Sequence, residues 1–415
     1  MSFREVPIGS VFSVVNGATP ASNEPRNWEG DIPWVGPADL GKLKSKWVAQ
    51  GARSITELGY RSCGTQMVPA GSIIMSTRAP IGHIAIARGR ICFNQGCRAL
   101  IPGMHIRSDF GYWALASLRD SFIAAGKGTT FLELSRDKLR SAKIPLPDIQ
   151  AQKSIAEFLD RATSRIDHLI EKKSALCALL SQRRHAEISA RINSALWPST
   201  KLKRLSTHPI TNGVGEAAEF DDSSWPRYVR ITDIATPTTL KENVFKSLPP
   251  EIAAKSLLKD GDILFAAVGA SYGKSYLHRV REGKFCYAGF LVRFRAGVLV
   301  SPEYISLWAQ SSNFWEQLEK GAVQSTIQNF SAGKYRNLEV PLPPRDEQDR
   351  IVSELGAATH KTDRLIDLTQ QSIRRLQEYR SSLIAAAVAG EIDFAAWKGD
   401  QSFSDNAPLA TEDAE

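Results

Sequence analysis

Residues 144–147, with the sequence IPLP, open a stretch that runs to Trp197 and occurs twice in the chain. The second copy opens with VPLP at residues 340–343, so the copies are separated by 340 − 144 = 196 residues. The same shift aligns Gln152 with Gln348, and the whole segment aligns without a gap. Because this period is far longer than that of solenoid repeats, the sequence indicates a domain duplication and not a repeat array.

Each copy has the pattern of one long helix. Apolar or small residues recur at alternating spacings of about 3 and 4, which is the period of a coiled-coil seam. Prolines stand just before each copy, where a starting helix tolerates the missing amide. A helix of about 45 residues would be roughly 65–70 Å long, too long to be stable without a partner. The predicted seam consists of Ile155, Leu159, Ile166, Leu169, Leu176 and Leu180, and of Ile351, Leu355, Leu365, Leu376 and Leu383.

The simplest partner for each long helix is the other copy. The two helices are therefore predicted to pack side by side as an intramolecular coiled coil. The alternative is that each one is a core helix of its own domain. The apolar seam favours the coiled coil, because it continues for longer than a typical globular helix.

Composition restricts the class of protein. The formal net charge of +8 and the pI of about 9.2 permit a polyanionic partner without requiring one. The five cysteines form no C-x-x-C pair, so neither a disulfide framework nor a zinc site is indicated, and they fit a reducing compartment. The N-terminus has no apolar signal run, and no stretch of about 18 apolar residues exists. A cytoplasmic protein that does not span a membrane is expected.

The segments that precede the two long helices share a plan. Each has short apolar runs separated by turn residues, which predicts a β-rich domain. Asn16-Gly17 in the first block has a counterpart in Asn212-Gly213 in the second, again at a shift of 212 − 16 = 196 residues. The first block should also contain a helix at about residues 110–124 and a short helix at residues 136–141, capped by Ser135.

No motif predicts an active site or a metal site. Residues 269–275 (GASYGKS) resemble a phosphate-binding loop, but three residues separate the glycines where that motif has four. The seven histidines form no HExxH motif and no pair at i, i+4. Neither a methyl-transfer signature nor a nuclease carboxylate cluster is present. We therefore predict no catalytic residue and no metal ligand.

The loops of both blocks carry side chains suited to DNA. Arginine and lysine contact phosphates or guanine edges, and asparagine and glutamine pair with adenine. Each such residue alone is a weak signal, since a single surface arginine is usually just solvated. The collective pattern favours two readers of short DNA sequences. The predicted DNA-binding residues are Arg78, Lys127, Thr129, Thr130, Arg136, Lys138 and Arg140, and Tyr272, Lys274, Arg279, Ser325, Thr326, Gln328, Lys334 and Arg336.

The chain resembles the DNA-specificity subunit of type I restriction-modification enzymes over about residues 6–394. The resemblance is carried by the two Pro-Leu-Pro openings and by four further motifs. These are TRAPIG at 77–82, NQG at 94–96, GTTF at 128–131 and LIAAAVAG at 383–390. The first long helix departs from the pattern, because Ala151 precedes Gln152 where glutamate is usual, and because it lacks the Ala-Val-x-Gly close.

The resemblance implies an α+β fold with an internal pseudo-twofold duplication. Two mixed α/β, β-rich target-recognition domains would be separated by two long spacer helices packed as an antiparallel coiled coil. The expected boundaries are a first recognition domain at 1–143, a first spacer helix at 144–197, a second recognition domain at 198–339, a second spacer helix at 340–394 and a disordered acidic tail at 395–415.

The resemblance also implies a function. The chain would bind double-stranded DNA at a bipartite site, with one half read by each recognition domain. It would dock two adenine-methyltransferase subunits and, through them, motor-nuclease subunits. S-adenosylmethionine, Mg²⁺ and ATP would belong to those partners, and this chain would be non-catalytic and hold no cofactor.

Two other hypotheses come from different classes of protein. The first is a coiled-coil scaffold whose flanking domains bind only proteins, against which the basic charge and the threonine-bearing loops argue. The second is a stand-alone nuclease or methyltransferase, against which the missing catalytic motifs argue. DNA binding that weakens with salt would distinguish a DNA reader from a scaffold.

Overall fold

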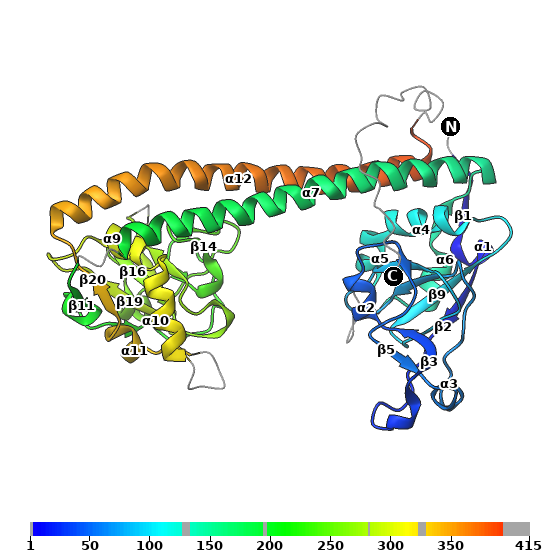
Figure 1. Ribbon diagram of the computed structural model, residues 1–415, viewed down its shortest axis with the longest axis horizontal. Helices are drawn as coiled ribbons and strands as arrows, with labels where there is room; N and C mark the ends of the chain where they lie inside the picture. The colour runs from blue at the N-terminus through cyan, green and yellow to red at the C-terminus, as the bar shows by residue number, and fades with distance from the viewer. Residues whose placement is uncertain (1–2, 127–132, 194–196, 281–282, 323–328, 393–415) are drawn as a thin grey trace. The chain divides into compact units, whose positions relative to one another are not determined.

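The computed structural model describes residues 3–126, 133–193, 197–280, 283–322 and 329–392 (Figure 1). The chain divides into two compact units. Unit 1 comprises Met1–Lys172 and Ser372–Glu415, and unit 2 comprises Lys173–Gln371. Each of the two long helices therefore contributes one part to each unit. In the described part of the chain, no helix is both long and apolar enough to cross a membrane.

Unit 1 is built around a five-stranded sheet in the order β2-β9-β6-β7-β4. Its strands pair antiparallel, except that β4 runs parallel to β7. Their bounds are Phe12–Asn16 (β2), Cys97–Pro102 (β9), Ile73–Ser76 (β6), Ile84–Ala87 (β7) and Trp47–Val48 (β4). A three-stranded sheet has the order β5-β3-β8, formed by Arg53–Ile55, Trp28–Val35 and Cys92–Phe93. A third sheet pairs β1 (Glu5–Pro7) with β10 (Lys143–Pro145).

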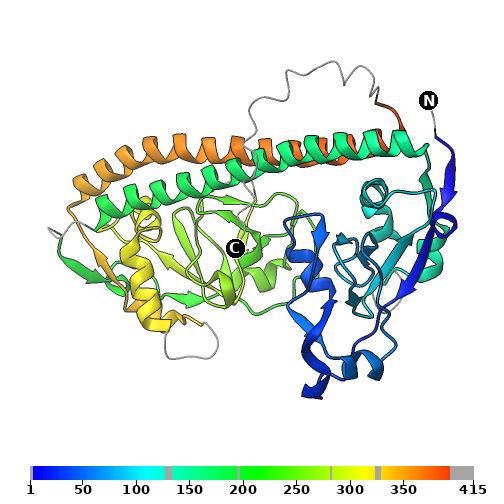
Figure 2. The same cartoon turned by 45° about the vertical axis from the view of Figure 1, so that its right-hand side comes forward.

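Short helices complete unit 1, which Figure 2 shows in blue to cyan. They are α1 (Ile8–Val11), η1 (Pro25–Asn27), α2 (Pro37–Lys42), α3 (Glu57–Ser62), α4 (Ser108–Ser117), α5 (Arg119–Ala125) and α6 (Arg136–Ser141). The bounds of α6 are those predicted from the sequence, and the Ser135 hydroxyl accepts from the Lys138 amide at 3.3 Å. The prediction of a single helix at residues 110–124 is wrong, because α4 and α5 are separate helices. The chain leaves α-helical geometry between them at Leu118, where φ is −93° and ψ is 5°.

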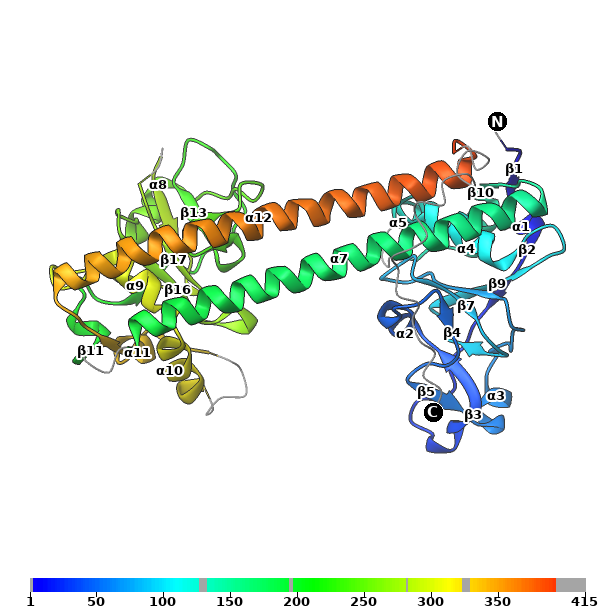
Figure 3. The same ribbon diagram turned by 45° about the horizontal axis from the view of Figure 1, so that its top comes forward.

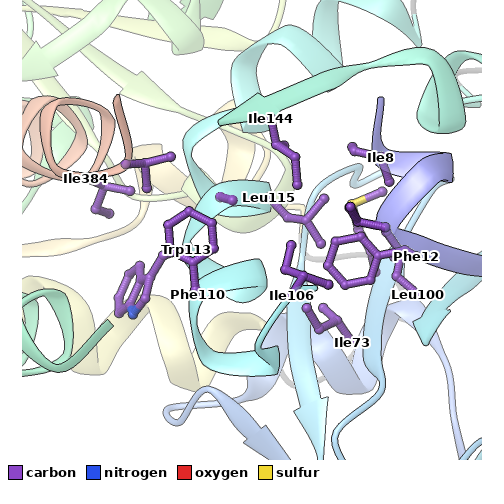
Figure 4. Packing of buried hydrophobic residues seen from close by; sticks show 14 of the residues in the cluster. Ile8, Phe12, Ile73, Leu100, Ile106, Phe110, Trp113, Leu115, Ile144 and Ile384 are labelled. Atoms are coloured by element: carbon purple, nitrogen blue, oxygen red, sulfur yellow. The ribbon is translucent and has the colours of Figure 1, made fainter. Parts of the chain in front are cut away.

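The core of unit 1 joins the sheet to both long helices. Phe12, Ile73 and Leu100 of the sheet and Phe110 of α4 are buried in one apolar cluster with Ile384 (Figure 4). The buried Ile155 and Leu159 belong to the same cluster. The long helices are therefore fixed to unit 1 by its main core.

Unit 2 repeats this plan with different residues. Its four-stranded antiparallel sheet has the order β12-β19-β16-β17, formed by Thr211–Asn212, Leu291–Arg295, Asp262–Ala266 and Ser275–Leu277. Three strand pairs flank it: β13 (Arg227–Val229) with β18 (Phe285–Tyr287), β14 (Ile234–Thr236) with β15 (Thr239–Leu240), and β11 (Ser199–Lys201) with β20 (Glu339–Pro341). Its helices are η2 (Leu202–Arg204), η3 (Ile231–Asp233), α8 (Pro250–Ala253), η4 (Ala254–Ser256), η5 (Gly269–Ser271), α9 (Pro302–Trp308), α10 (Ser312–Ala322) and α11 (Ala332–Arg336).

The core of unit 2 also joins its sheet to both long helices. Phe265 of the central strand stacks on Phe314 and Tyr335, with ring centroids 5.8 and 5.1 Å apart. The buried Ile188 and Ile351 of the long helices lie in the same cluster. Burial of these large side chains supplies the main stabilisation of the unit.

The long helices are α7 (Ile149–Ile192, 44 residues) and α12 (Arg345–Ala389, 45 residues), which run side by side in Figure 3. They pack antiparallel within each unit. In unit 1, Ile155 lies in the same core as Ile384, while Asp167, further along α7, pairs with Arg380, earlier in α12.

Unit 2 has the same antiparallel arrangement. Cys177 Sγ lies 3.9 Å from the Ile366 carbonyl oxygen, and Arg191, further along α7, pairs with Glu354, earlier in α12. The predicted coiled coil is confirmed.

The burial of the predicted seam residues is uneven. Leu169, Leu176 and Leu365 are 40%, 41% and 45% exposed. Their neighbours Ile170, Cys177 and Ile366 are less exposed. The other predicted seam positions are buried at Ile155, Leu159, Ile166, Ile351 and Leu355 and half-buried at Leu180, Leu376 and Leu383. The least exposed row of each helix therefore advances by four residues after Ile166 or Thr362, where the sequence pattern suggested three.

Candidate nucleic-acid interface

Unit 1 has a rim where four segments meet at the ends of its strands. We define the rim of unit 1 as residues 17–19, 77–78, 94–98 and 133–134. The Ala18 amide donates to the Phe93 carbonyl at 3.0 Å, and the Thr77 amide donates to the Gly96 carbonyl at 2.8 Å. The Leu134 amide then donates to the Thr77 carbonyl at 2.8 Å. These bonds hold the four segments together as one frame.

Unit 2 builds the same frame. We define its rim as residues 213–215, 267–268, 288–292 and 329–330. The Val214 amide donates to the Tyr287 carbonyl at 3.1 Å, and the Ala267 amide donates to the Phe290 carbonyl at 2.9 Å. The Phe330 amide donates to the Ala267 carbonyl at 2.8 Å. Each of the three bonds described for the rim of unit 1 thus has a counterpart in unit 2.

One glycine in each rim is required by the close approach of two strands. A Cβ atom at Gly17 would overlap the carbonyl oxygens of Phe93 and Asn94. A Cβ atom at Gly213 would overlap the carbonyl oxygen of Tyr287. The Asn-Gly pairs found in the sequence therefore allow the segment after β2 or β12 to pack closely on the neighbouring strand.

The rim of unit 1 carries a network of polar side chains. The Asn94 amide nitrogen donates to the Thr19 hydroxyl at 2.7 Å, and Asn94 Oδ1 accepts from the Gly96 amide at 2.6 Å. The Thr19 hydroxyl donates in turn to Gln95 Oε1. The sequence motif at 94–96 was visible, but Thr19 and Gln95 were not predicted as site residues. Their partnership spans 76 residues of sequence, so local spacing could not reveal it.

Two arginines share one carboxylate beside this network. Arg78 Nε lies 3.0 Å from Glu133 and an Arg98 terminal nitrogen lies 3.4 Å from it. Half of the Arg78 side chain is exposed, whereas that of Arg98 is mostly covered. Two guanidinium groups on one carboxylate leave a net positive charge at the rim. Arg78 was predicted as a DNA-binding residue, and it lies at this rim.

The remaining predicted residues of unit 1 that the structure describes have contacts within the protein. Lys138 Nζ donates to the carbonyl oxygen of Ala125 at the end of α5, at 2.8 Å. Arg136 donates to the carbonyl oxygen of Val14 at 3.1 Å. The Arg140 side chain lies against Gly9, where a Cβ atom would be 2.9 Å from Arg140 Nε. Lys127, Thr129 and Thr130 lie outside the described residues.

The predicted residues of unit 2 are arranged similarly. Lys334 Nζ donates to the Gly321 carbonyl in α10 at 2.8 Å, which repeats the Lys138 contact at a shift of 334 − 138 = 196 residues. Arg336 donates to the carbonyl oxygen of Ile210 at 3.0 and 2.8 Å. Two of the predicted basic residues thus stabilise the ends of helices, where a cation interacts favourably with the helix dipole.

Three more predicted residues lie apart from one another on unit 2. Lys274 Nζ donates to the Ile234 carbonyl at 2.5 Å, and desolvation, with a smaller effect of Lys241, lowers the pKa of Lys274. Tyr272 packs edge-on against Trp315. Arg279 pairs with Asp260 and Glu303. Ser325, Thr326 and Gln328 lie outside the described residues.

A buried glutamine fixes the start of each long helix. Gln152 Nε2 donates to the His105 and Pro147 carbonyls at 2.9 Å each, and Gln152 Oε1 accepts from the Arg107 amide at 2.9 Å. Gln348 makes the same three bonds in unit 2, to Leu299, Pro343 and Ser301. The glutamines aligned by the sequence repeat therefore join each long helix to the loop after its sheet.

Three buried cysteine thiols have raised pKa values. No group of three or more His, Cys, Asp or Glu side chains could hold a metal ion among those residues. Burial raises the pKa of the Cys92 thiol to about 11 and the pKa values of the Cys97 and Cys286 thiols to about 12. These thiols stay protonated at neutral pH and are poor nucleophiles.

Comparison with known proteins gives related matches along the chain. Residues 2–176 match the family model described as the type I restriction modification DNA specificity domain. The type I restriction enzyme MjaIX specificity subunit of Methanocaldococcus jannaschii is 34% identical over 168 residues, which cover 40% of this chain and 38% of that protein. The match thus spans well under half of the length of that relative.

Two further matches extend over most of the chain. The EcoBI specificity subunit of Escherichia coli is 22% identical, and the match covers 96% of this chain and 88% of that protein. A solved chain, from a structure on complex assembly and conformational transition of the type I R-M system, has a TM-score of 0.66 at 15% identity. That match covers 94% of this chain and 98% of the other, and it is a likeness of fold.

Proposed function

We propose that this chain belongs to the family of type I restriction-modification DNA specificity subunits and that it reads a bipartite DNA site. Each unit would read one short half of the site, and the base pairs between the halves would not be read. We also propose that the recognition domains and spacer helices end at residues 143, 197, 339 and 394. The recognition domains would be the parts of the two units that precede the long helices.

One observation carries the proposal. The two units repeat the same backbone bonds at their rims, but the side chains on those frames differ. Thr19, Gln95 and Arg78 of the rim of unit 1 have Gly215, Gly289 and Val268 at the corresponding places in unit 2. A repeated frame with different side chains suits two readers that recognise different base pairs, because base contacts give specificity while the frame gives position.

The exposed apolar residues of the long helices support the docking of partner proteins. Leu169 and Leu365 occupy equivalent positions, at a shift of 365 − 169 = 196 residues, and both are substantially exposed. Leu176, Leu179, Leu368 and Tyr379 are exposed on the same two helices. Exposed apolar residues on a helix indicate an interaction surface. We assign this surface to two adenine-methyltransferase subunits, through which motor-nuclease subunits would join.

Catalysis would then belong to the partners. S-adenosylmethionine would be used by the methyltransferase subunits, and Mg²⁺ and ATP by the motor-nuclease subunits. The present chain would place those subunits on the DNA, hold no cofactor and carry no reacting group. We place the complex in the cytoplasm, where DNA entering a cell would be met.

A selection experiment tests the proposal directly. The full chain, purified with its methyltransferase partner, is incubated with a library of random duplexes, and the bound DNA is sequenced. We expect two short specified blocks separated by an unspecified gap. The affinity for DNA should fall as salt rises, with a logarithmic slope near −0.9 for each phosphate contact. Absent or salt-independent binding would instead support the protein scaffold.

Two controls sharpen this experiment. Exchanging residues 1–143 for the block of a relative should change one half of the selected site, and a change in both halves would contradict the modular reading. The pure chain should neither cut nor methylate DNA when S-adenosylmethionine, Mg²⁺ and ATP are added. Cleavage or methylation by the pure chain would revive the hypothesis of a stand-alone enzyme.

A further inference from the structure

We propose that the rim of unit 1 contacts base edges and that Gln95 is the side chain that reads an adenine there. This inference rests on the proposed function, because it names the reading residue within one of the two readers. The corresponding place in unit 2 is Gly289, which has no side chain to read with. The two halves of the site should therefore be read by different chemistry.

The contacts of Gln95 hold its amide in one orientation. Gln95 is exposed, and its Oε1 accepts from the Thr19 hydroxyl. The Thr19 hydroxyl is itself fixed, because the Asn94 amide donates to it at 2.7 Å. A side chain held in advance loses less conformational freedom on binding than a free one does. The arrangement therefore prepares Gln95 for a contact outside the protein.

The unused groups of Gln95 match adenine. Its Nε2 has no hydrogen-bond partner among the described residues. An amide oxygen has two lone pairs, so Oε1 can still accept a second bond beside that from Thr19. The pair of a free donor and a free acceptor fits N7 and the N6 amino group of adenine in the major groove.

The neighbours of Gln95 make contacts that stabilise the rim. The contact described for the Gln95 side chain is the bond from Thr19, which orients it. Asn94 bonds to both Thr19 and the Gly96 amide. Gly96 lies close to Pro37, where a Cβ atom would be 3.1 Å from Pro37 Cγ. The motif at 94–96 thus has a structural reason at its first and third positions. Its middle residue is left for contact with a partner.

The charge beside Gln95 suits a polyanion. Arg78 and Arg98 share the single carboxylate of Glu133, at 3.0 and 3.4 Å. The Arg78 side chain is exposed, so its guanidinium group is available to a phosphate. Phosphate contacts position a reader, and base contacts then give the sequence preference. Gln95 and Arg78 would supply one contact of each kind.

The rim of unit 2 offers apolar groups where the rim of unit 1 offers polar ones. Phe290 is 64% exposed, and Val268 occupies the place of Arg78. Apolar side chains in the major groove contact the methyl group of thymine. The structure thus gives a reason for two unlike halves, and a change at Gln95 should affect only one of them.

The test compares the wild-type chain with Gln95→Ala and Gln95→Glu, each purified with the methyltransferase partner, in the random-duplex selection. Gln50→Ala, at an exposed glutamine outside the rim, is the matched control. In the Gln95→Ala protein, we expect preference for adenine at one position of one half to fall by roughly tenfold to a hundredfold. Gln95→Glu should shift that position toward cytosine, whose amino group a carboxylate accepts.

Thr19→Val gives an independent readout. Valine keeps the shape of threonine but removes the hydroxyl that orients Gln95. We expect a weaker loss of preference at the same base position and none elsewhere. Because Thr19 acts through Gln95, the double substitution with Gln95→Ala should lose no more preference than Gln95→Ala alone.

Four outcomes would overturn the inference. They are an unchanged site in Gln95→Ala, equal weakening on all sequences, changes in both halves, and loss of DNA binding by both Gln95 variants. Equal weakening would indicate a phosphate contact, and loss by both variants with an unchanged unfolding temperature would indicate a different role. If the wild-type chain selects a bipartite site and Gln95→Ala selects the same one, only the inference about Gln95 fails. If the wild-type chain selects no site, the proposed function itself fails.

Discussion

Arg184 of α7 and Asp363 of α12 form an ion pair across the two long helices, with Arg184 Nε 2.7 Å from Asp363 Oδ1. The sequence repeat relates this pair to a second ion pair between the same two helices, and that pair is present as well. Arg380 Nε lies 2.8 Å from Asp167 Oδ1. The two aspartates are 363 − 167 = 196 residues apart, and the two arginines are 380 − 184 = 196 residues apart. The same two residue types therefore make the same antiparallel contact in unit 2 and in unit 1.

Each of the two ion pairs should make a small contribution to stability. The aspartate side chains are 52% exposed in both pairs, so solvent weakens each interaction, and we expect a coupling energy of about 0.5 kcal/mol. Double-mutant cycles with Asp→Asn and Arg→Met at each pair, read from urea unfolding, measure it. The exposed pair of Arg183 with Glu187, which stays within α7, is the control. Coupling in only one of the two cross-helix pairs would show that the units are not equivalent here.

Gln152→Ala should destabilise unit 1, and Gln348→Ala should destabilise unit 2. Each substitution leaves one backbone amide and two carbonyl groups without their side-chain partner at a buried site, which costs about 3 kcal/mol. The measurement is the urea midpoint followed by helical circular dichroism. Exposed Gln66→Ala is the control and should change the stability by less than about 0.5 kcal/mol. A loss below about 1 kcal/mol in either glutamine variant would contradict the role of these bonds.

Lys138→Met and Lys334→Met should affect stability and not the salt dependence of DNA binding. Both lysines donate to carbonyl groups near helix ends, so losing the cation should cost roughly 0.3–1 kcal/mol. The logarithmic salt slope should remain that of the wild-type complex. A slope reduced in magnitude by about 0.9 would place the lysine against a phosphate instead. Arg78→Met is the comparison, because its exposed guanidinium should contribute to the slope.

High pH should weaken the fold through its buried thiols. Burial raises the pKa of Cys97 and of Cys286 to about 12 in the folded protein, and an unfolded thiol ionises near 8.5. The folded pKa is the higher one, so the stabilising effect is complete below pH about 8.5 and is lost as pH rises toward 12. Urea unfolding between pH 8 and 11 checks this, and the loss attributable to the thiols should disappear in the Cys97→Ala/Cys286→Ala protein. A thiol reagent at pH 8 should label both cysteines only after unfolding.

Lengthening both long helices should widen the unread part of the DNA site. Four residues inserted after 175 and after 371 lie between the two ion pairs, so both pairs keep their local partners. Four residues add about 6 Å of helix, which corresponds to nearly two base pairs of DNA. The random-duplex selection should show a longer gap between unchanged half-sites. A change in the bases read, with the gap unchanged, would contradict the spacing role of the helices.

The sequence predicted the parts of the fold that repeat or follow a simple period. The duplication predicted the two long helices, and the Asn-Gly pairs marked the ends of β2 and β12. Ser135 marked the start of α6, because a serine side chain can accept from the amide three residues later. Each of these signals lies within a few residues of the structure that it predicts.

The parts that the sequence could not predict depend on distant contacts. One example is which residues of each long helix face the other helix. Leu169 and Ile170 are both apolar, and only packing decides which of them faces the other helix. The role of Lys138 is another, because its partner carbonyl belongs to Ala125 on a different helix. The link between Thr19 and Gln95 is a third. Basic and amide residues in the sequence thus indicate that the protein has a surface suited to DNA. The fold determines which of these side chains are available to contact a partner.

The ion pairs between the long helices have a consequence for shorter chains. Residues 1–197 alone contain both Asp167 and Arg184, which are the two halves of one contact. Two identical copies of that segment, placed antiparallel, would meet Asp167 of one copy with Arg184 of the other, twice. Such a homodimer would carry two identical readers and would select an inverted repeat. Two different proteins of half length could mix in the same way, so that new target sites would arise by subunit exchange without any change in sequence.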